Sequence, residues 1–178
     1  MSMSRPAICI VLATALLCVP ADGRDGPRFG KPADTARIAA WDIDVSPDGT
    51  GLPPGSGSVV QGARLFAEKC AMCHGAAGAC QPADRLTGGV GTLRAPRPIK
   101  TVASYWPYAT TLFSYISSAM PINDPQSLTP DEVYALLAYL LSIDGIVGKD
   151  AVLDAGNLAE IRMPNRDGFR NVWDHPSP

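Results

Sequence analysis

Two cysteines and a histidine that lie close together in the chain could hold a redox-active group. Cys70 and Cys73 are separated by two residues, and His74 follows the second cysteine directly. This Cys-x-x-Cys-His spacing is typical of c-type haem, which forms thioethers with both sulfur atoms and takes the histidine as an axial ligand of its iron. The single motif predicts one covalently bound haem c.

A cysteine pair of this spacing could instead bind zinc or act as a redox dithiol. Zinc needs four ligands, and the other local candidates are His74 and Cys80. Because Cys73 and His74 are adjacent, the chain would have to bend back on itself to bind one metal ion through both. A dithiol of the thioredoxin type begins a helix after a strand, whereas this pair follows an expected helix. Haem is therefore the prediction.

The segment before the motif predicts an amphipathic helix that delivers Cys70. Gly62, Phe66 and Cys70 are four residues apart and share one helix face. Ser58 is a residue type that favours the N-cap position. A glycine inside a helix costs about 1 kcal/mol relative to alanine, so Gly62 indicates that another helix crosses closely there, with Phe66 packed beside the crossing.

The iron needs a second axial ligand for electron transfer, and Met120 is the predicted one, opposite His74. Met72 lies inside the attachment motif and cannot reach the opposite side of the ring. Met163 lies in a polar C-terminal segment, and His175 is three residues from the chain end. These two residues, or an open sixth position, are the alternatives.

A helix over residues 109–119 should lead to this ligand. Leu112 and Ile116 share a face that, continued by one turn, reaches Met120. Pro121 disfavours helical backbone in the preceding residue. The helix should therefore end next to Met120 and present it from a turn.

A last helix is predicted after Thr129. Thr129 and Glu132 form a capping box, Pro130 suits the first helical position, and Gly145 should end the helix. Its apolar stripe should pack on the first helix, and consists of Val133, Leu136, Leu137, Leu140 and Leu141.

The chain divides into four segments by composition. Residues 1–21 have the pattern of a secretory signal peptide, with an apolar run too short to span a membrane. Residues 22–57 form an arm rich in proline and glycine, in which the alternation over 41–45 predicts an extended stretch. Residues 58–148 are the haem domain, and residues 149–178 are a tail. Because c-type haem is attached outside the bacterial cytoplasm, we expect a periplasmic protein.

Charge and histidine content argue against several other functions. The net charge is −2, and no basic stretch suits nucleic acid. A haem peroxidase or ligand sensor would need an open sixth position and a distal acid–base residue, and the only histidine besides His74 is His175. We therefore expect electron transfer, with no substrate chemistry performed by this chain.

Together these features resemble a class I cytochrome c, an all-α fold whose helices wrap round the haem. The resemblance is closer to the SoxD-type cytochrome subunit of the sulfur-oxidising (Sox) system. It rests on the haem motif and on stretches outside it, namely 41–45, 84–89, 105–113, 119–121 and 163–169.

The resemblance implies a partner and a source of electrons. In that family the cytochrome docks on a molybdenum-cofactor subunit that oxidises sulfane sulfur, and it passes the electrons to a smaller carrier. Related cytochromes serve sulfite dehydrogenases, and some members carry two haems where this chain has one motif. A free soluble shuttle is the alternative. Whether the arm and the tail lie on a partner or on their own domain is left open by the sequence.

Overall fold

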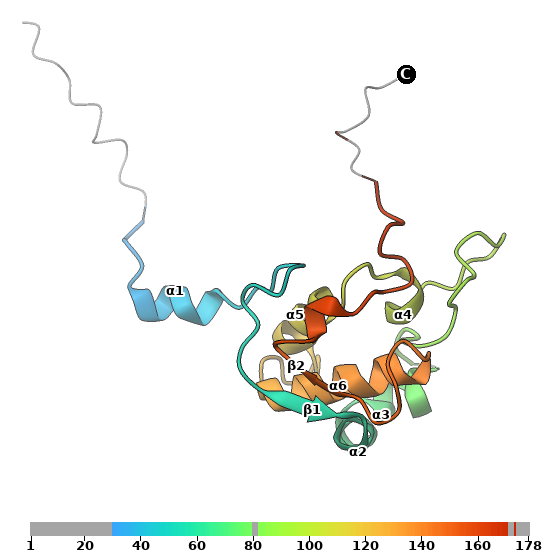
Figure 1. Ribbon diagram of the computed structural model, residues 1–178. Helices are drawn as coiled ribbons and strands as arrows, with labels where there is room; N and C mark the ends of the chain where they lie inside the picture. Colours follow the sequence, from blue (N-terminus) through green and yellow to red (C-terminus); the bar gives the residue numbers. More distant parts are fainter. Residues whose placement is uncertain (1–29, 80–81, 171–172, 174–178) are drawn as a thin grey trace, which may run out of the picture.

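The computed structural model describes residues 30–79, 82–170 and 173 (Figure 1). The predicted signal peptide, Cys80 and His175 lie outside the described residues. Two short 3₁₀ helices and a two-stranded sheet accompany the α-helices. The helices are α1 (Thr35–Trp41), α2 (Val59–Lys69), α3 (Ala71–His74), α4 (Val102–Tyr105), α5 (Ala109–Ala119), α6 (Pro130–Ile143), η1 (Ala76–Gly78) and η2 (Leu158–Glu160), and the strands are β1 (Ser56–Ser58) and β2 (Val152–Asp154).

The fold is centred on the crossing of α2 and α6. A Cβ atom on Gly62 would lie 1.8 Å from the carbonyl oxygen of Ala135, so only glycine allows the two backbones to come this close. Phe66 is buried, and its ring centroid lies 5.4 Å from that of Tyr139 on α6. The predicted crossing at Gly62 and Phe66 is confirmed.

The predicted helix ends are also confirmed. Ser58 and Gln61 form a capping box at the start of α2, and Thr129 and Glu132 form one at the start of α6. Gly145 follows α6 with a φ of +69°, a conformation that glycine adopts without strain and that commonly ends helices.

The prediction of an all-α fold was incomplete, because β1 and β2 pair antiparallel, with Gly57 opposite Leu153. Gly57 lies directly against α6, and a Cβ atom there would be 2.2 Å from the backbone nitrogen of Ala135. The absence of a side chain thus lets a strand lie on the helix. A strand of sequence Ser-Gly-Ser carries no apolar alternation from which it could be predicted.

The C-terminal segment adds to the same core. Leu153, Leu158 and Met163 are each less than 5% exposed and pack with the buried side chains of α5 and α6. Met163, which the sequence places in a polar tail, is therefore a core residue. Residues 149–163 lie on the haem domain of their own chain and not apart from it.

The arm, residues 22–57, contains a helix followed by an extended stretch. Ile43 and Val45 are partly buried and alternate with exposed Asp42 and Asp44, as the alternation predicts. The extended stretch begins only after Trp41, because Asp34 caps a helix that ends there. This helix, α1, projects to one side of the molecule in Figure 1.

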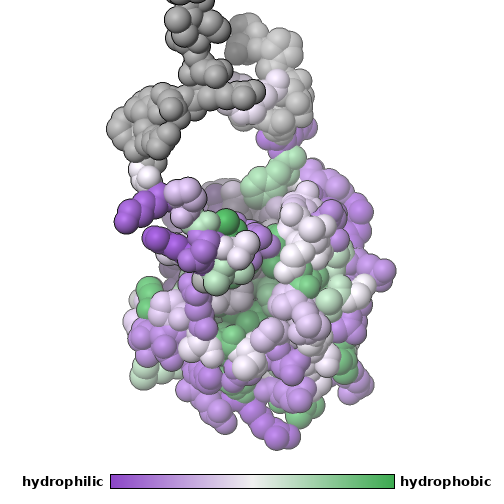
Figure 2. Space-filling model, turned by 90° about the vertical axis from the view of Figure 1, so that its left-hand side faces the viewer, coloured by the Kyte–Doolittle hydropathy of each residue, from purple (hydrophilic) through white to green (hydrophobic). Residues whose placement is uncertain are grey.

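The surface seen from the side of α1 is mostly polar. Figure 2 shows hydrophilic residues over most of this face, with apolar side chains in small separate patches between them. A cavity of about 310 Å³ lies between the arm and the helices α5 and α6, and its lining includes Ile43, Phe113, Leu128 and Val133. None of the four predicted haem ligands lines this cavity, so it is not the haem site.

Candidate haem site

One helical turn brings the attachment motif together. Cys70 closes α2, with its backbone N–H donating to the carbonyl of Phe66 at 2.9 Å. The backbone N–H groups of Cys73 and His74 then both donate to the carbonyl of Cys70, at 3.1 and 3.0 Å. These bonds hold both thiols and the imidazole on a single turn at the end of α2.

The two thiols are free and partly buried. Burial raises the pKa of the Cys70 thiol to about 11, with the neighbouring Cys73 adding to the rise and Lys69 opposing it. A protonated, partly buried thiol is a poor nucleophile, whereas reactive dithiols have lowered pKa values. Within the described ranges, no group of three or more Cys, His, Asp or Glu side chains is placed to hold a metal ion. The raised pKa of Cys70 is thus opposite in direction to that of reactive dithiols.

His74 is oriented by a backbone carbonyl. Its Nδ1 atom lies 2.9 Å from the carbonyl oxygen of Asp84. Because a carbonyl can only accept, Nδ1 must donate, and in neutral imidazole Nε2 then carries the lone pair. The segment that supplies this carbonyl is tied back to the motif, since the backbone N–H of Ala83 donates to the carbonyl of Cys73 at 2.8 Å. Fixing a ligand histidine through its other nitrogen is the usual way in which proteins orient it.

The Asp84 carbonyl was not singled out as part of the site by sequence reasoning. Any residue type supplies a backbone carbonyl, so no side-chain signal could have identified it. In the sequence, the stretch 84–89 is distinguished only by the family resemblance.

Met120 lies at the end of α5, as predicted. Its backbone is extended (φ −120°, ψ 146°), its N–H donates to the carbonyl of Ile116, and its side chain is partly buried. Met163 is 1% exposed within the core, and Met72 is 83% exposed on α3. Among the methionines of the described residues, Met72, Met120 and Met163, Met120 alone is both partly accessible and outside the attachment turn, which supports it as the second ligand.

The loop after Met120 is ordered by its own hydrogen bonds. The backbone N–H of Asp124 donates to the carbonyl of Pro121 at 2.9 Å, and the hydroxyl of Ser127 donates to the carbonyl of Asp124 at 2.7 Å. The loop ends at Thr129, which caps α6. Met120 is therefore held between the end of one helix and the fixed start of another.

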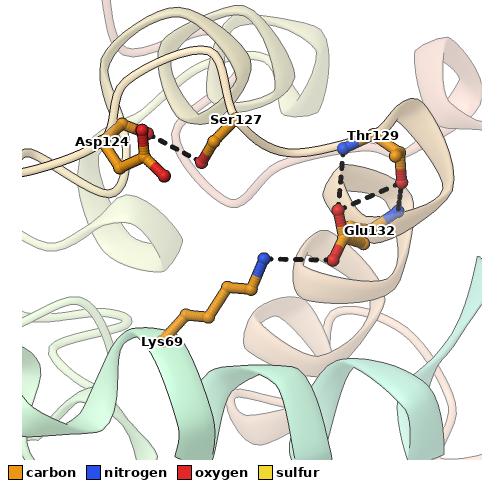
Figure 3. A network of polar contacts seen from close by, with 5 residues as sticks. All are labelled: Lys69, Asp124, Ser127, Thr129 and Glu132. Carbon is orange, nitrogen blue, oxygen red and sulfur yellow. Dashed lines mark hydrogen bonds and ion pairs between the residues drawn. The ribbon is translucent and has the colours of Figure 1, made fainter.

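An ion pair links the helix that follows this loop to the attachment helix (Figure 3). Lys69, the residue before Cys70, lies 3.2 Å from the Glu132 carboxylate on α6. The backbone N–H of Thr129, and after it Lys69, holds the pKa of Glu132 below its ordinary value. Both side chains are about one-third exposed, so the pair contributes less than about 1 kcal/mol. Its effect is to connect the helix that carries Cys70 with the helix that follows the Met120 loop.

The donor set fits haem c. Two free thiols, an imidazole whose Nε2 is available and a methionine thioether are the groups that this cofactor bonds. Cys70 and Met120 both pack against the one apolar core and both remain partly exposed. They therefore lie at the edge of an apolar region, the environment that a flat, largely apolar ring requires.

Comparison with known proteins agrees with this site. The family model for cytochrome c matches residues 59–144, which run from the start of α2 to the end of α6. No curated protein matches the chain. The chain belongs to the cytochrome c family, whose members bind haem covalently and transfer electrons.

A solved structure defines the relationship more closely. The chain is 42% identical to a chain in the crystal structure of the sulfane dehydrogenase SoxCD from Paracoccus pantotrophus, with a TM-score of 0.77. The match covers 84% of this chain and 74% of that one. It extends well beyond the residues of the family model, so the similarity includes segments that flank the cytochrome core. The protein is thus a c-type cytochrome related to the Sox system.

Proposed function

We propose that this protein is a periplasmic monohaem cytochrome that accepts electrons from a molybdenum-dependent dehydrogenase subunit acting on sulfane sulfur or sulfite. It then passes them to a smaller carrier. The observation that supports the proposal most strongly is the similarity to sulfane dehydrogenase, at 42% identity over 84% of the chain.

Four side chains hold the cofactor in this proposal. Cys70 and Cys73 would supply the thioether sulfurs, and His74 Nε2 and the Met120 thioether would bind the iron. When bound, haem supplies an iron that takes up and releases one electron. The chain contributes rigidity: the Asp84 carbonyl fixes the imidazole, and the capped start of α6 fixes the loop after Met120. Methionine opposite histidine favours a comparatively high reduction potential.

The partner is proposed to bind the outer part of the arm. Helix α1 has seven residues, and isolated helices this short are marginal in water. Its largest apolar side chains are nevertheless exposed, Ile38 by 54% and Trp41 by 80%. A subunit that covers this apolar face would stabilise the helix, whereas a free shuttle has no use for it.

The proposed compartment follows from the sequence. Residues 1–21 have the pattern of a cleavable signal peptide, and covalent haem attachment takes place outside the bacterial cytoplasm. Within the part of the chain that the structure describes, every helix is too short or too polar to cross a bilayer.

The visible spectrum of the matured protein tests the ligand assignment. We expect a low-spin, six-coordinate spectrum with the weak far-red band of methionine bound to ferric haem. Met120→Ala should abolish that band and lower the reduction potential. Met72→Ala, which removes an equally long but fully surface-located side chain, should change neither. A high-spin spectrum of the unmodified protein, or a band that survives Met120→Ala, would contradict the assignment and direct attention to peroxide or gas binding.

A further inference from the structure

The charges of this acidic protein are distributed unevenly. Two short stretches, 94–100 and 162–170, together contain six Lys and Arg residues and one carboxylate, that of Asp167. The rest of the described chain has about twice as many carboxylates as cations. We call these two stretches the basic face, and its cations are Arg94, Arg97, Lys100, Arg162, Arg166 and Arg170.

The two stretches meet at Tyr105, although they are more than sixty residues apart in the sequence. The Lys100 ammonium lies 4.9 Å from the centroid of the Tyr105 ring, and the Phe169 ring lies 5.2 Å from the same centroid. The Asn165 side-chain amide donates to the carbonyl of Tyr105 at 2.7 Å. Figure 1 shows the loop that contains residues 94–100 and the C-terminal segment on the same side of the molecule as α4.

Tyr108 holds the second stretch, 162–170, at two further points. The Arg166 guanidinium lies 4.1 Å from the centroid of the Tyr108 ring, and the backbone of Arg162 forms a β-bridge with Tyr108. Arg162 pairs with Asp167, which is the one ion pair of this face within the described residues. Three of the six cations, Lys100, Arg162 and Arg166, are thus held by aromatic or backbone contacts, and among the described residues only Arg162 is paired with a carboxylate.

The loop that holds Arg94 and Arg97 is stiff. Pro96 and Pro98 fix the backbone φ between and after the two arginines. At its base the hydroxyl of Thr92 accepts from the backbone N–H of Ile99 at 3.0 Å. Both arginines are exposed. Two exposed positive charges are therefore presented on a loop of restricted backbone freedom.

The chemistry of this face suits a transient partner. Permanent subunit interfaces are depleted of charge in their centre and resemble a protein core, a description that fits the arm helix better. Weak electron-transfer encounters are small and are steered by complementary charge. We infer that the basic face docks the downstream electron acceptor and that this acceptor is a redox protein with an acidic surface. This inference rests on the proposed electron-transfer function.

The test measures oxidation of the reduced holoprotein by two small oxidants of opposite charge. Ferricyanide is an anion and tris(phenanthroline)cobalt(III) is a cation. Their relative rates report the electrostatic potential at the part of the surface through which electrons leave the protein. At low ionic strength the double variant Arg94→Glu/Arg97→Glu should react about tenfold more slowly with ferricyanide and faster with the cobalt complex. High salt should remove both differences, because it screens exposed charges.

A matched control separates local charge from net charge. Arg64→Glu/Lys149→Glu makes the same change in net charge at two exposed positions outside both the basic face and the arm helix. It should alter both rates much less. Poly-L-glutamate, as an acidic polypeptide probe, should slow the ferricyanide reaction of the unmodified protein but not that of the Arg94/Arg97 variant.

Three results would overturn the inference. Equal effects of the two double variants would mean that only net charge matters. Unchanged rates in the Arg94/Arg97 variant would mean that electrons do not leave near this face. Unchanged rates together with lost pelleting on phosphatidylglycerol vesicles would assign the face to a lipid surface instead. The visible spectrum distinguishes failure of this inference from failure of the proposed function. A high-spin spectrum of the unmodified protein would contradict the electron-transfer function. A six-coordinate spectrum, together with equal oxidation rates for the two double variants, would contradict only the docking role of the basic face.

Discussion

The two segments that flank the cytochrome domain differ in where their apolar side chains lie. The C-terminal segment places Leu153, Leu158 and Met163 in the core, with each at most 4% exposed. The outer arm leaves Ile38 and Trp41 in solvent. One flank therefore stabilises the domain, and the other has apolar surface that contributes nothing to the fold of this chain. The difference suggests that the arm is retained for a partner.

The largest expected effect is on the stability of the packed flank. Leu158 is fully buried, so Leu158→Ala should lower the free energy of unfolding by about 2–5 kcal/mol. Ile38→Ala removes a comparable side chain from the arm and should change it by less than about 0.5 kcal/mol. Denaturant titration of the two holoprotein variants measures both. A loss for Ile38→Ala similar to that for Leu158→Ala would show that the arm also packs on its own domain.

The second largest expected effect is on the affinity for the proposed dehydrogenase subunit, and only substitutions in the arm should change it. If α1 docks on the dehydrogenase subunit, Trp41 is its largest exposed apolar side chain and the best candidate for an interface hot spot. Trp41→Ala should then weaken the complex by about 2 kcal/mol or more, roughly thirtyfold in Kd. Val152→Ala, an exposed apolar position in the packed flank, is the control and should leave the affinity unchanged.

Co-expression of the chain with the proposed molybdenum subunit, followed by titration of the purified components, gives these affinities. A complex that tolerates Trp41→Ala as well as Val152→Ala would remove the reason for assigning the arm to a partner. The haem spectrum of both variants should match that of the unmodified protein, because neither residue belongs to the proposed ligand set.

The contrast between the two flanks was not available from the sequence. The helix caps at Ser58 and Thr129 and the close crossing at Gly62 were predictable, because each depends on residues near one another in the sequence or on a missing side chain. The burial of Met163 depends on where α5 and α6 happen to leave space. Composition alone classed its surroundings as a polar tail.

The candidate site likewise contains residues that the sequence predicts and a group that only the folded structure reveals. Cys70, Cys73 and His74 are recognisable because the chemistry requires these side chains at this spacing. Met120 was selected by elimination and by the proline that follows it, and the structure adds that Met163 is enclosed in the core. The Asp84 carbonyl that orients His74 is a backbone group, and only the path of the folded chain brings it within 2.9 Å of the imidazole.

The smallest expected effect is that of the ion pair between Lys69 and Glu132. Its contribution to the free energy of unfolding can be compared with that of the apolar packing of the C-terminal flank. Glu132 pairs with Lys69, and its pKa is lowered first by the backbone N–H of Thr129 and then by Lys69. A carboxylate whose folded pKa is depressed contributes stability above its unfolded pKa, and this contribution is lost as pH falls through the folded value. Glu132→Gln keeps a side chain that completes a capping box and removes only the charge.

Glu132→Gln should therefore lower the free energy of unfolding at pH 7 by no more than about 1 kcal/mol, and the difference from the unmodified protein should shrink toward zero in acid below the depressed pKa. Urea titrations at pH 7 and at acid pH measure it, with Glu68→Gln as a control for loss of an exposed charge from the neighbouring helix. The ligand band should survive at pH 7 if packing dominates. A loss larger than that of Leu158→Ala, or one that grows in acid, would mean that the ion pair, rather than apolar packing, holds the Met120 loop against the attachment helix.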